Sequence, residues 1–145
     1  MINLIYFSAA SYLYSNDELA TLLTEFRLKN VSLNITGLLL YHDGSIIQIL
    51  EGEAEDVHAL FNSIKIDLRH TSVTKVIDCN IEERSFSNWS MGFKNISKQD
   101  FSKLNGYLNI ENKNEFTEIK ISNNTQIIRM VNSFASVNML NDFQF

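Results

Sequence analysis

The chain has 145 residues, of which 45% are hydrophobic and 20% charged, and its formal net charge at pH 7 is −5. Length and composition are those of one folded globular domain, with no support for a second. The acidic balance argues against broad nucleic-acid binding, because neutralising phosphates needs a clustered basic face and no run of Lys and Arg supplies one. We therefore expect a small molecule or another protein as the partner.

The N-terminus has no basic segment before its apolar residues, and no apolar stretch approaches the roughly 20 residues of a membrane helix. We therefore expect a soluble cytoplasmic protein that makes no membrane contact. The single cysteine, Cys79, excludes an internal disulfide. We interpret it as a buried small apolar residue in preference to a catalytic nucleophile.

The N-terminal third combines a strand pattern with a helix pattern. Residues 2–8 alternate apolar positions and are rich in β-forming types, which predicts a strand away from the sheet edge that carries Tyr6. Ser15 and Glu18 form a capping-box signature before apolar residues at i, i+3, i+4 and i+7 spacing. This spacing predicts an amphipathic helix that ends near Asn30.

The middle of the chain predicts a hairpin, a helix and two further strands. Two apolar runs flank Asp43-Gly44, a dipeptide typical of tight β-hairpins. Residues 54–67 again keep helical apolar spacing, and residues 72–81 and 88–96 have strand patterns.

The predicted order βαββαββ indicates an α+β ferredoxin-like sandwich with one extra strand and both helices on one face of the sheet. The other face needs a cover. Residues 98–108 and the apolar stripe of residues 127–137 predict C-terminal helices that cap it, although the stripe could instead form a subunit contact. We accordingly divide the chain into a core, residues 1–97, and a helical extension, residues 98–145.

Common catalytic and metal-binding motifs are absent from the sequence. The five glycines form neither GxGxxG nor a P-loop, and there is no GxSxG nucleophile elbow. No metal site is predicted, because the three histidines lack HExxH and Cys/His spacing: His42, His58 and His70. A group of acidic residues resembles a solvated turn entering the second helix, an interpretation we prefer to an acid–base pair: Glu51, Glu53, Glu55 and Asp56.

Gln48 stands in the middle of SIIQILEG, a run that is apolar on both faces at period two and so predicts a central strand. Burying an amide without partners costs about 1–3 kcal/mol, so Gln48 must find hydrogen bonds inside the protein. Tyr6, Asn30, Trp89 and Met91 are further polar or soft side chains at expected core positions. Each has a structural explanation alone, such as a core phenol or a helix C-cap. Together they suggest a planar ligand with hydrogen-bonding edges.

These residues resemble the BLUF domain, a blue-light sensor that uses flavin. The resemblance rests on LIYFS, N-x5-TGLLLY, IIQILEGE, IKIDLRH and SFSNWSM, in this order, over roughly residues 2–93. It implies a flavin between the two helices, FAD in the first instance, with FMN possible. The length and the expected trailing helices are similar to short stand-alone BLUF proteins without an effector domain, which implies that the chain is not an enzyme.

The resemblance also assigns roles to individual residues. It implies that Tyr6 is the photochemical tyrosine, that Gln48 bonds both tyrosine and flavin, and that Asn30 bonds the C4 carbonyl and N3 edge of the flavin. The D-x-R-H segment is implied to contact the flavin O2 edge and the ribityl–phosphate side: Asp67, Arg69 and His70. Lys29 replaces a common Asn, His or Arg, and could still meet a phosphate as a point charge.

Signal relay is implied for Trp89 and Met91, and Ser8 matches a position near Trp89. Asn34 replaces a common glycine, which suggests a left-handed backbone there. The implied output is a rearrangement of the Tyr–Gln–flavin hydrogen bonds that reaches an unidentified downstream protein, or a change in a homo-oligomer. Two alternatives remain: a light-independent interaction module with the same fold, and an acylphosphatase-like enzyme, whose phosphate-loop pattern is absent.

Overall fold

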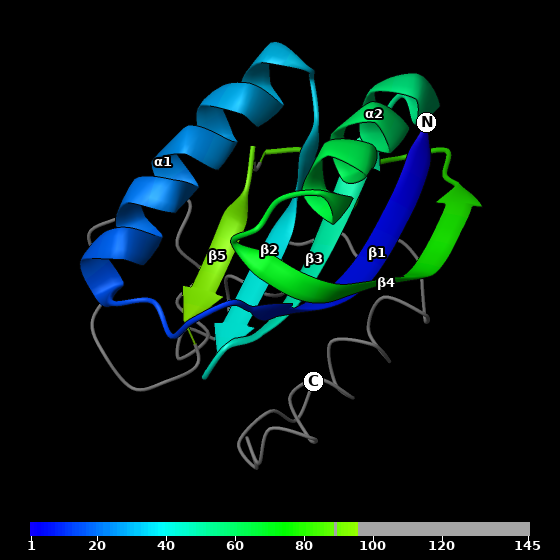
Figure 1. The fold of residues 1–145 in the computed structure, drawn as a ribbon. Coiled ribbons are helices and arrows are strands. Elements are labelled where there is room, and N and C mark those ends of the chain that lie inside the picture. The colour runs from blue at the N-terminus through cyan, green and yellow to red at the C-terminus, as the bar shows by residue number, and fades with distance from the viewer. Residues whose placement is uncertain (89, 96–145) are drawn as a thin grey trace, which may run out of the picture.

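The computed structural model describes residues 1–88 and 90–95, which form one sheet with two helices on the same face (Figure 1). In chain order the elements are β1 (Ile2–Ala10), α1 (Asn16–Ser32), β2 (Thr36–His42), β3 (Ser45–Gly52), α2 (Ala54–Lys65), β4 (His70–Asn80) and β5 (Gly92–Asn95). The predicted order and α+β class are therefore confirmed over this part of the chain. The predicted extension, residues 98–145, with its capping helices lies outside the described residues.

The strands lie in the order β4-β1-β3-β2-β5. The first four form antiparallel pairs, which is the ferredoxin-like arrangement, whereas β5 runs parallel to β2 at the edge. The strand β5 begins only at Gly92, later than predicted, so Met91 precedes it. None of the helices described here is long and apolar enough to cross a membrane.

The β2–β3 hairpin has the predicted two-residue turn. Asp43 and Gly44 both have positive φ angles, 43° and 85°, as the turns favoured between twisted strands require. The Gly44 carbonyl accepts a hydrogen bond from the backbone N–H of Ala10 at 2.7 Å, so the turn is also tied to the end of β1.

Helix α1 begins with the predicted capping box. The Ser15 Oγ accepts from the Glu18 backbone N–H at 3.3 Å, and the Glu18 carboxylate accepts from the Ser15 backbone N–H at 2.8 Å. After the helix, Asn34 has a φ of 50°, which confirms the left-handed backbone expected there. This sharp turn redirects the chain into β2.

The core between the sheet and the helices contains the side chains that the strand and helix patterns predict, including Leu4, Leu23, Leu50 and Val57. The opposite face of the sheet is also buried, at Ile5, Leu38, Leu40, Ile47 and Ile49. The central strand β3 is therefore apolar on both faces, as its sequence predicts.

Two predictions about burial are wrong. Glu51 is not part of a solvated turn: it lies at the end of β3 with 0% of its surface exposed. Its carboxylate accepts hydrogen bonds from Asn3 Nδ2 (3.1 Å) and from the backbone N–H groups of Ser85 (3.1 Å) and Phe86 (3.0 Å). Burial raises the pKa of Glu51, and these donors oppose that shift. Cys79 is partly exposed because β4 is an edge strand.

Gly37, in the TGLLLY segment, lies against the backbone of β3. A Cβ atom there would stand 1.9 Å from the Ile49 carbonyl oxygen, so the two strands would have to move apart. We expect Gly37→Ala to lower the free energy of unfolding by about 1–3 kcal/mol or more, measured by chemical denaturation. Gly52→Ala is the matched control, because its Cβ would meet only side-chain atoms and the Asn34 carbonyl at 3.2 Å or more. An equal loss in both variants would contradict this explanation.

Candidate functional site

A pocket opens between α1 and α2 over the sheet, with a volume of about 850 Å³ including its solvent-open mouth. Its walls are mainly apolar side chains of the two helices and the central strands: Leu19, Leu22, Leu23, Phe26, Leu39, Ile46, Leu60 and Ile64. The stripe on α1 thus contributes to both regions: Leu19 and Leu23 are fully packed in the core beneath the pocket, and Leu22 and Phe26 are only half-buried.

At the floor of the pocket, Tyr6 and Gln48 lie directly opposite each other on the neighbouring strands β1 and β3. Their side chains are 1% and 6% exposed, and the Tyr6 hydroxyl donates a hydrogen bond to Gln48 Oε1. On its other side, Gln48 Nε2 contacts the Sδ atom of Met91 at 3.6 Å. The buried amide therefore joins a phenol to a thioether.

The phenol of Tyr6 is held in its neutral form. Burial raises its pKa well above the usual value, and the nearby negative charge of Asp67 adds to the shift. The ring packs against Phe61, with ring centroids 5.4 Å apart. A proton therefore remains on Tyr6 at neutral pH and is shared with the amide of Gln48.

The C-terminal half of α1 binds the chain just before β5. The buried side chain of Asn30 donates from Nδ2 to the Ser90 carbonyl at 2.7 Å. One turn earlier, Arg27 Nε donates to the Met91 carbonyl at 3.0 Å. Sequence reasoning missed Arg27. The signal was its i, i+3 spacing to Asn30, which places both side chains on one face of the helix.

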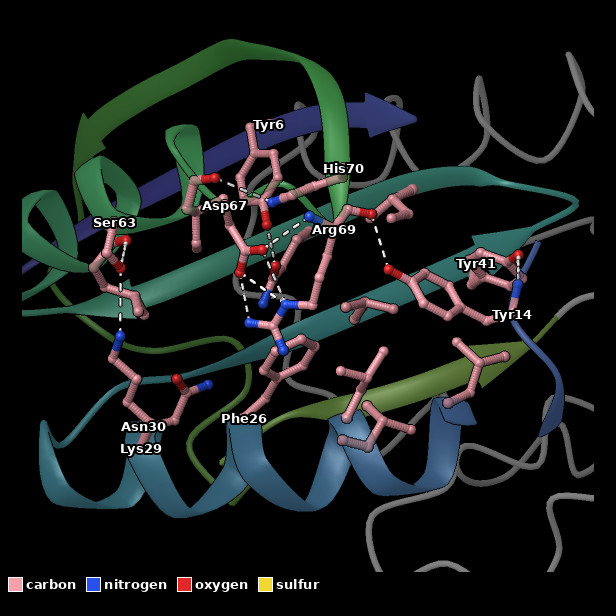
Figure 2. Close-up of a pocket in the computed structure, with 18 residues that line it drawn as sticks. Tyr6, Tyr14, Phe26, Lys29, Asn30, Tyr41, Ser63, Asp67, Arg69 and His70 are labelled. Atoms are coloured by element: carbon pink, nitrogen blue, oxygen red, sulfur yellow. Dashed lines mark hydrogen bonds and ion pairs between the residues drawn. The ribbon is translucent and has the colours of Figure 1, made fainter. Parts of the chain in front are cut away.

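The segment after α2 turns back toward the pocket through an ion pair. Arg69 Nε donates to both carboxylate oxygens of Asp67, at 3.0 and 2.9 Å, and its guanidinium lies 5.3 Å from the ring centroid of Phe26 (Figure 2). The hydrogen bond from Arg69 lowers the pKa of Asp67, although burial acts in the opposite direction. Arg69 also approaches Glu25 of α1 at 3.4 Å. Asp67 and Arg69, which the resemblance assigns to the site, both line the pocket.

His70 lies beside Tyr6 and connects three elements. Its Nδ1 is 2.9 Å from the Ser8 Oγ of β1, and its Nε2 is 3.1 Å from the Ile64 carbonyl of α2. Ser8 therefore pairs with His70, and its expected position near Trp89 stays a prediction, because Trp89 lies outside the described residues. Among the residues described, no group of three or more His, Cys, Asp or Glu side chains could hold a metal ion.

Lys29 and Ser63 face each other across the pocket from α1 and α2 (Figure 2). Lys29 Nζ donates to Ser63 Oγ at 3.3 Å, so the cation stands at the open, exposed side of the site. Two tyrosines that were not predicted also line it: the Tyr14 backbone N–H donates to the Tyr41 hydroxyl at 3.2 Å. Tyr41 follows Leu39 at period two in TGLLLY, and this spacing could have placed it on the pocket face.

The fold and the site define a ferredoxin-like domain with a helix-flanked pocket whose floor is a buried phenol–amide pair. The sequence profile of the BLUF family, "Sensors of blue-light using FAD", matches residues 1–92. The chain therefore belongs to the BLUF family of flavin-using blue-light sensors.

Known relatives and structures agree with this assignment. The chain is 38% identical over 88 residues to the photoactivated adenylate cyclase subunit alpha of Euglena gracilis, covering 61% of this chain and 9% of that protein. It spans about a tenth of the length of the curated relatives it matches.

Among solved structures, BlsA in its photo-activated state has a TM-score of 0.62 and 28% identity, covering 86% of this chain and 97% of that one. Klebsiella pneumoniae BlrP1 with FMN and cyclic diGMP has a TM-score of 0.75 and 25% identity, covering 93% and 34%.

The residues present fit a flavin. A planar ring system with polar edges needs apolar walls, amides at its rim and cations near its phosphates. The pocket combines apolar side chains of both helices with the amides of Asn30 and Gln48, and it has Lys29 and Arg69 among its lining residues. An amide has two N–H hydrogens and an oxygen, so the bond to Ser90 does not exhaust Asn30.

Burial lowers the pKa of His70 below its usual value, although the nearby Asp67 carboxylate opposes the shift. The unfolded chain therefore binds more protons just below about pH 6.5, so the contribution of His70 to stability is complete above that pH and is lost as the pH falls. Between about pH 6.5 and 5, we expect the free energy of unfolding to fall more steeply for the wild type than for His70→Gln, measured by urea denaturation. Parallel curves would contradict this.

Proposed function

We propose that this chain is a blue-light photoreceptor whose light response depends on the hydrogen bond between Tyr6 and Gln48 beneath a bound flavin. The observation that carries the proposal is this bond at the floor of the pocket, between two fully buried side chains on neighbouring strands. Neither a phenol nor an amide is needed there for packing, since apolar residues of similar size would fill the same space without any need for hydrogen bonds.

Flavin binding is assigned to polar residues around the ring and near the mouth of the pocket: Lys29, Asn30, Gln48, Asp67, Arg69 and His70. Asn30 and Gln48 are the buried hydrogen-bonding groups, and Lys29 and Arg69 supply positive charge for phosphate. FAD is the expected cofactor, in line with the description of the family, and FMN is the alternative because a BlrP1 structure contains it.

When bound, the flavin supplies an electron acceptor that blue light makes strongly oxidising. Tyr6 is the expected electron donor. Its neutral phenol must also release its proton when it is oxidised, and Gln48 Oε1 already accepts that hydrogen bond. The return of the electron and proton restores Tyr6 but can leave the amide of Gln48 rotated or tautomerised, with different donors and acceptors. Gln48 would then no longer meet Met91 as it does now.

Because a half-satisfied buried network is costly, a rearranged Gln48 should displace Met91 and the start of β5. We propose that the output passes from there, with Trp89 in the relay, into residues 98–145 and on to a partner protein or a homo-oligomer. Binding and light response are thus separate properties of this site, and each can be tested by its own substitution.

Tyr6→Phe and Gln48→Leu should each abolish a reversible red shift of the flavin absorption band after blue light, while the purified protein still contains flavin. The reason is that each removes one end of the Tyr6–Gln48 bond but leaves the pocket walls unchanged. The measurement is an absorption spectrum before and after illumination, followed through dark recovery.

Tyr41→Phe is the matched control. Tyr41 is also a buried tyrosine that lines the pocket, but its hydroxyl contacts the backbone N–H of Tyr14 and not Gln48. It should keep the reversible shift. A normal photocycle in Tyr6→Phe or Gln48→Leu would refute the assignment, and a wild-type protein that binds no flavin would favour a light-independent interaction module.

Asn30→Ala should reduce flavin occupancy after purification, because it removes a buried hydrogen-bonding group worth about 1–3 kcal/mol, or roughly tenfold or more in affinity. Flavin content per protein is measured from the ratio of absorbance at the flavin and protein bands. Asn62→Ala, at an exposed position on α2 that does not line the pocket, is the control. Equal occupancy in all three proteins would show that Asn30 does not hold the flavin.

A further inference from the structure

We propose that Arg27 is a positioning residue: it holds the backbone of Met91 so that the Met91 thioether stays on the amide of Gln48 in the dark state. The contacts that support it are between protein atoms, and the effect on the light response rests on the proposed function. Arg27 lies outside the BLUF sequence motifs of this chain.

Two contacts converge on Met91. Its Sδ atom lies 3.6 Å from Gln48 Nε2, and its carbonyl oxygen accepts from Arg27 Nε at 3.0 Å. Met91 is only 1% exposed, so neither contact competes with bulk water. The position of one residue is therefore set by the sheet through its side chain and by α1 through its backbone.

Holding the guanidinium of Arg27 in this position costs free energy. Arginine head groups are usually solvated, yet Arg27 Nη2 is buried and has no hydrogen-bond partner among residues 1–88 and 90–95. Burial also lowers the pKa of Arg27. A surface arginine with a free choice of rotamer would return that donor to water. The bond to the Met91 carbonyl offsets this cost and fixes the orientation of the side chain.

Asn30 adds a second bond to the same segment, from Nδ2 to the Ser90 carbonyl. Two side chains one turn apart on α1 thus hold two successive carbonyls, directly before Gly92 pairs with Leu38 on β2. If Asn30 also binds flavin, its substitution would affect both flavin binding and the bond to Ser90. Substitution of Arg27 affects only the bond to Met91, because Arg27 does not line the pocket. Arg27 can therefore be altered without removing a pocket residue.

The bond between Arg27 and Met91 should affect how fast the protein returns from the light state. When Gln48 rearranges, the Met91 side chain loses its partner and is displaced, and the bond to Arg27 limits how far the backbone moves with it. Without this bond, Met91 must be repositioned before its contact with Gln48 forms again, so dark recovery becomes slower. Hydrogen bonds to charged groups correspond to roughly tenfold or more in an equilibrium, and we expect slowing of about tenfold.

The test uses the full chain with bound flavin and 13C-methyl-labelled methionine. The chain has four methionines, and Met91→Leu assigns the Met91 signal. Arg27→Met removes the donor but keeps the aliphatic stem, and Arg27→Lys keeps the charge. Arg84→Met is the matched control, since Arg84 also donates to a backbone carbonyl, that of Asn34, on a different segment. The readouts are the Met91 methyl resonance in the dark and the rate of dark recovery.

We expect Arg27→Met to shift the Met91 resonance and to slow dark recovery about tenfold, and Arg27→Lys to restore part of both. Arg84→Met should leave the Met91 resonance in place and change the recovery rate by less than about twofold. An unchanged Met91 resonance or recovery rate in Arg27→Met overturns the proposal, as does an equal effect of Arg84→Met. If the wild type shows no light response, the proposed function fails, and the dark-state resonance still decides whether Arg27 positions Met91.

Discussion

The buried hydrogen bond between Tyr6 and Gln48 is the interaction on which the rest of the site depends. It exists because the β1–β3 register places the two residues opposite each other, and any slip by one residue would turn one of the side chains to the other face of the sheet. Burial keeps the phenol protonated and strengthens the bond, since water cannot replace it. Tertiary structure thus brings two ordinary side chains together as a buried, hydrogen-bonded pair.

The two helices contribute differently to the pocket above Tyr6 and Gln48. Helix α1 covers the core with Leu19 and Leu23, lines the pocket with Leu22 and Phe26, and binds the 90–91 segment through Arg27 and Asn30. Helix α2 contributes the opposite wall and leads into the Asp67–Arg69 ion pair. One helix therefore contributes to both the core and the pocket, and it connects the pocket to the segment just before β5.

The loop between β4 and β5 is held at two places by buried groups. Glu51 accepts from the backbone N–H groups of Ser85 and Phe86, on the side of the sheet away from the pocket. Arg27 and Asn30 hold the carbonyls a few residues later. Because side chains bind the loop backbone at both places, local sequence within the loop has little influence on where it lies.

Local patterns in the sequence were sufficient for the helices, the hairpin and the order of elements along the chain, because capping boxes, Asp-Gly turns and periods of two and 3.6 act over a few residues. The resemblance to BLUF proteins identified most of the polar residues that line the pocket, but not its apolar walls. The burial of Glu51 and the contact of Arg27 could not be predicted, since their partners lie up to 35 and 64 residues away. Residue type indicates a solvated charge at both positions; only the folded chain, which brings distant backbone groups to each charge, makes burial favourable.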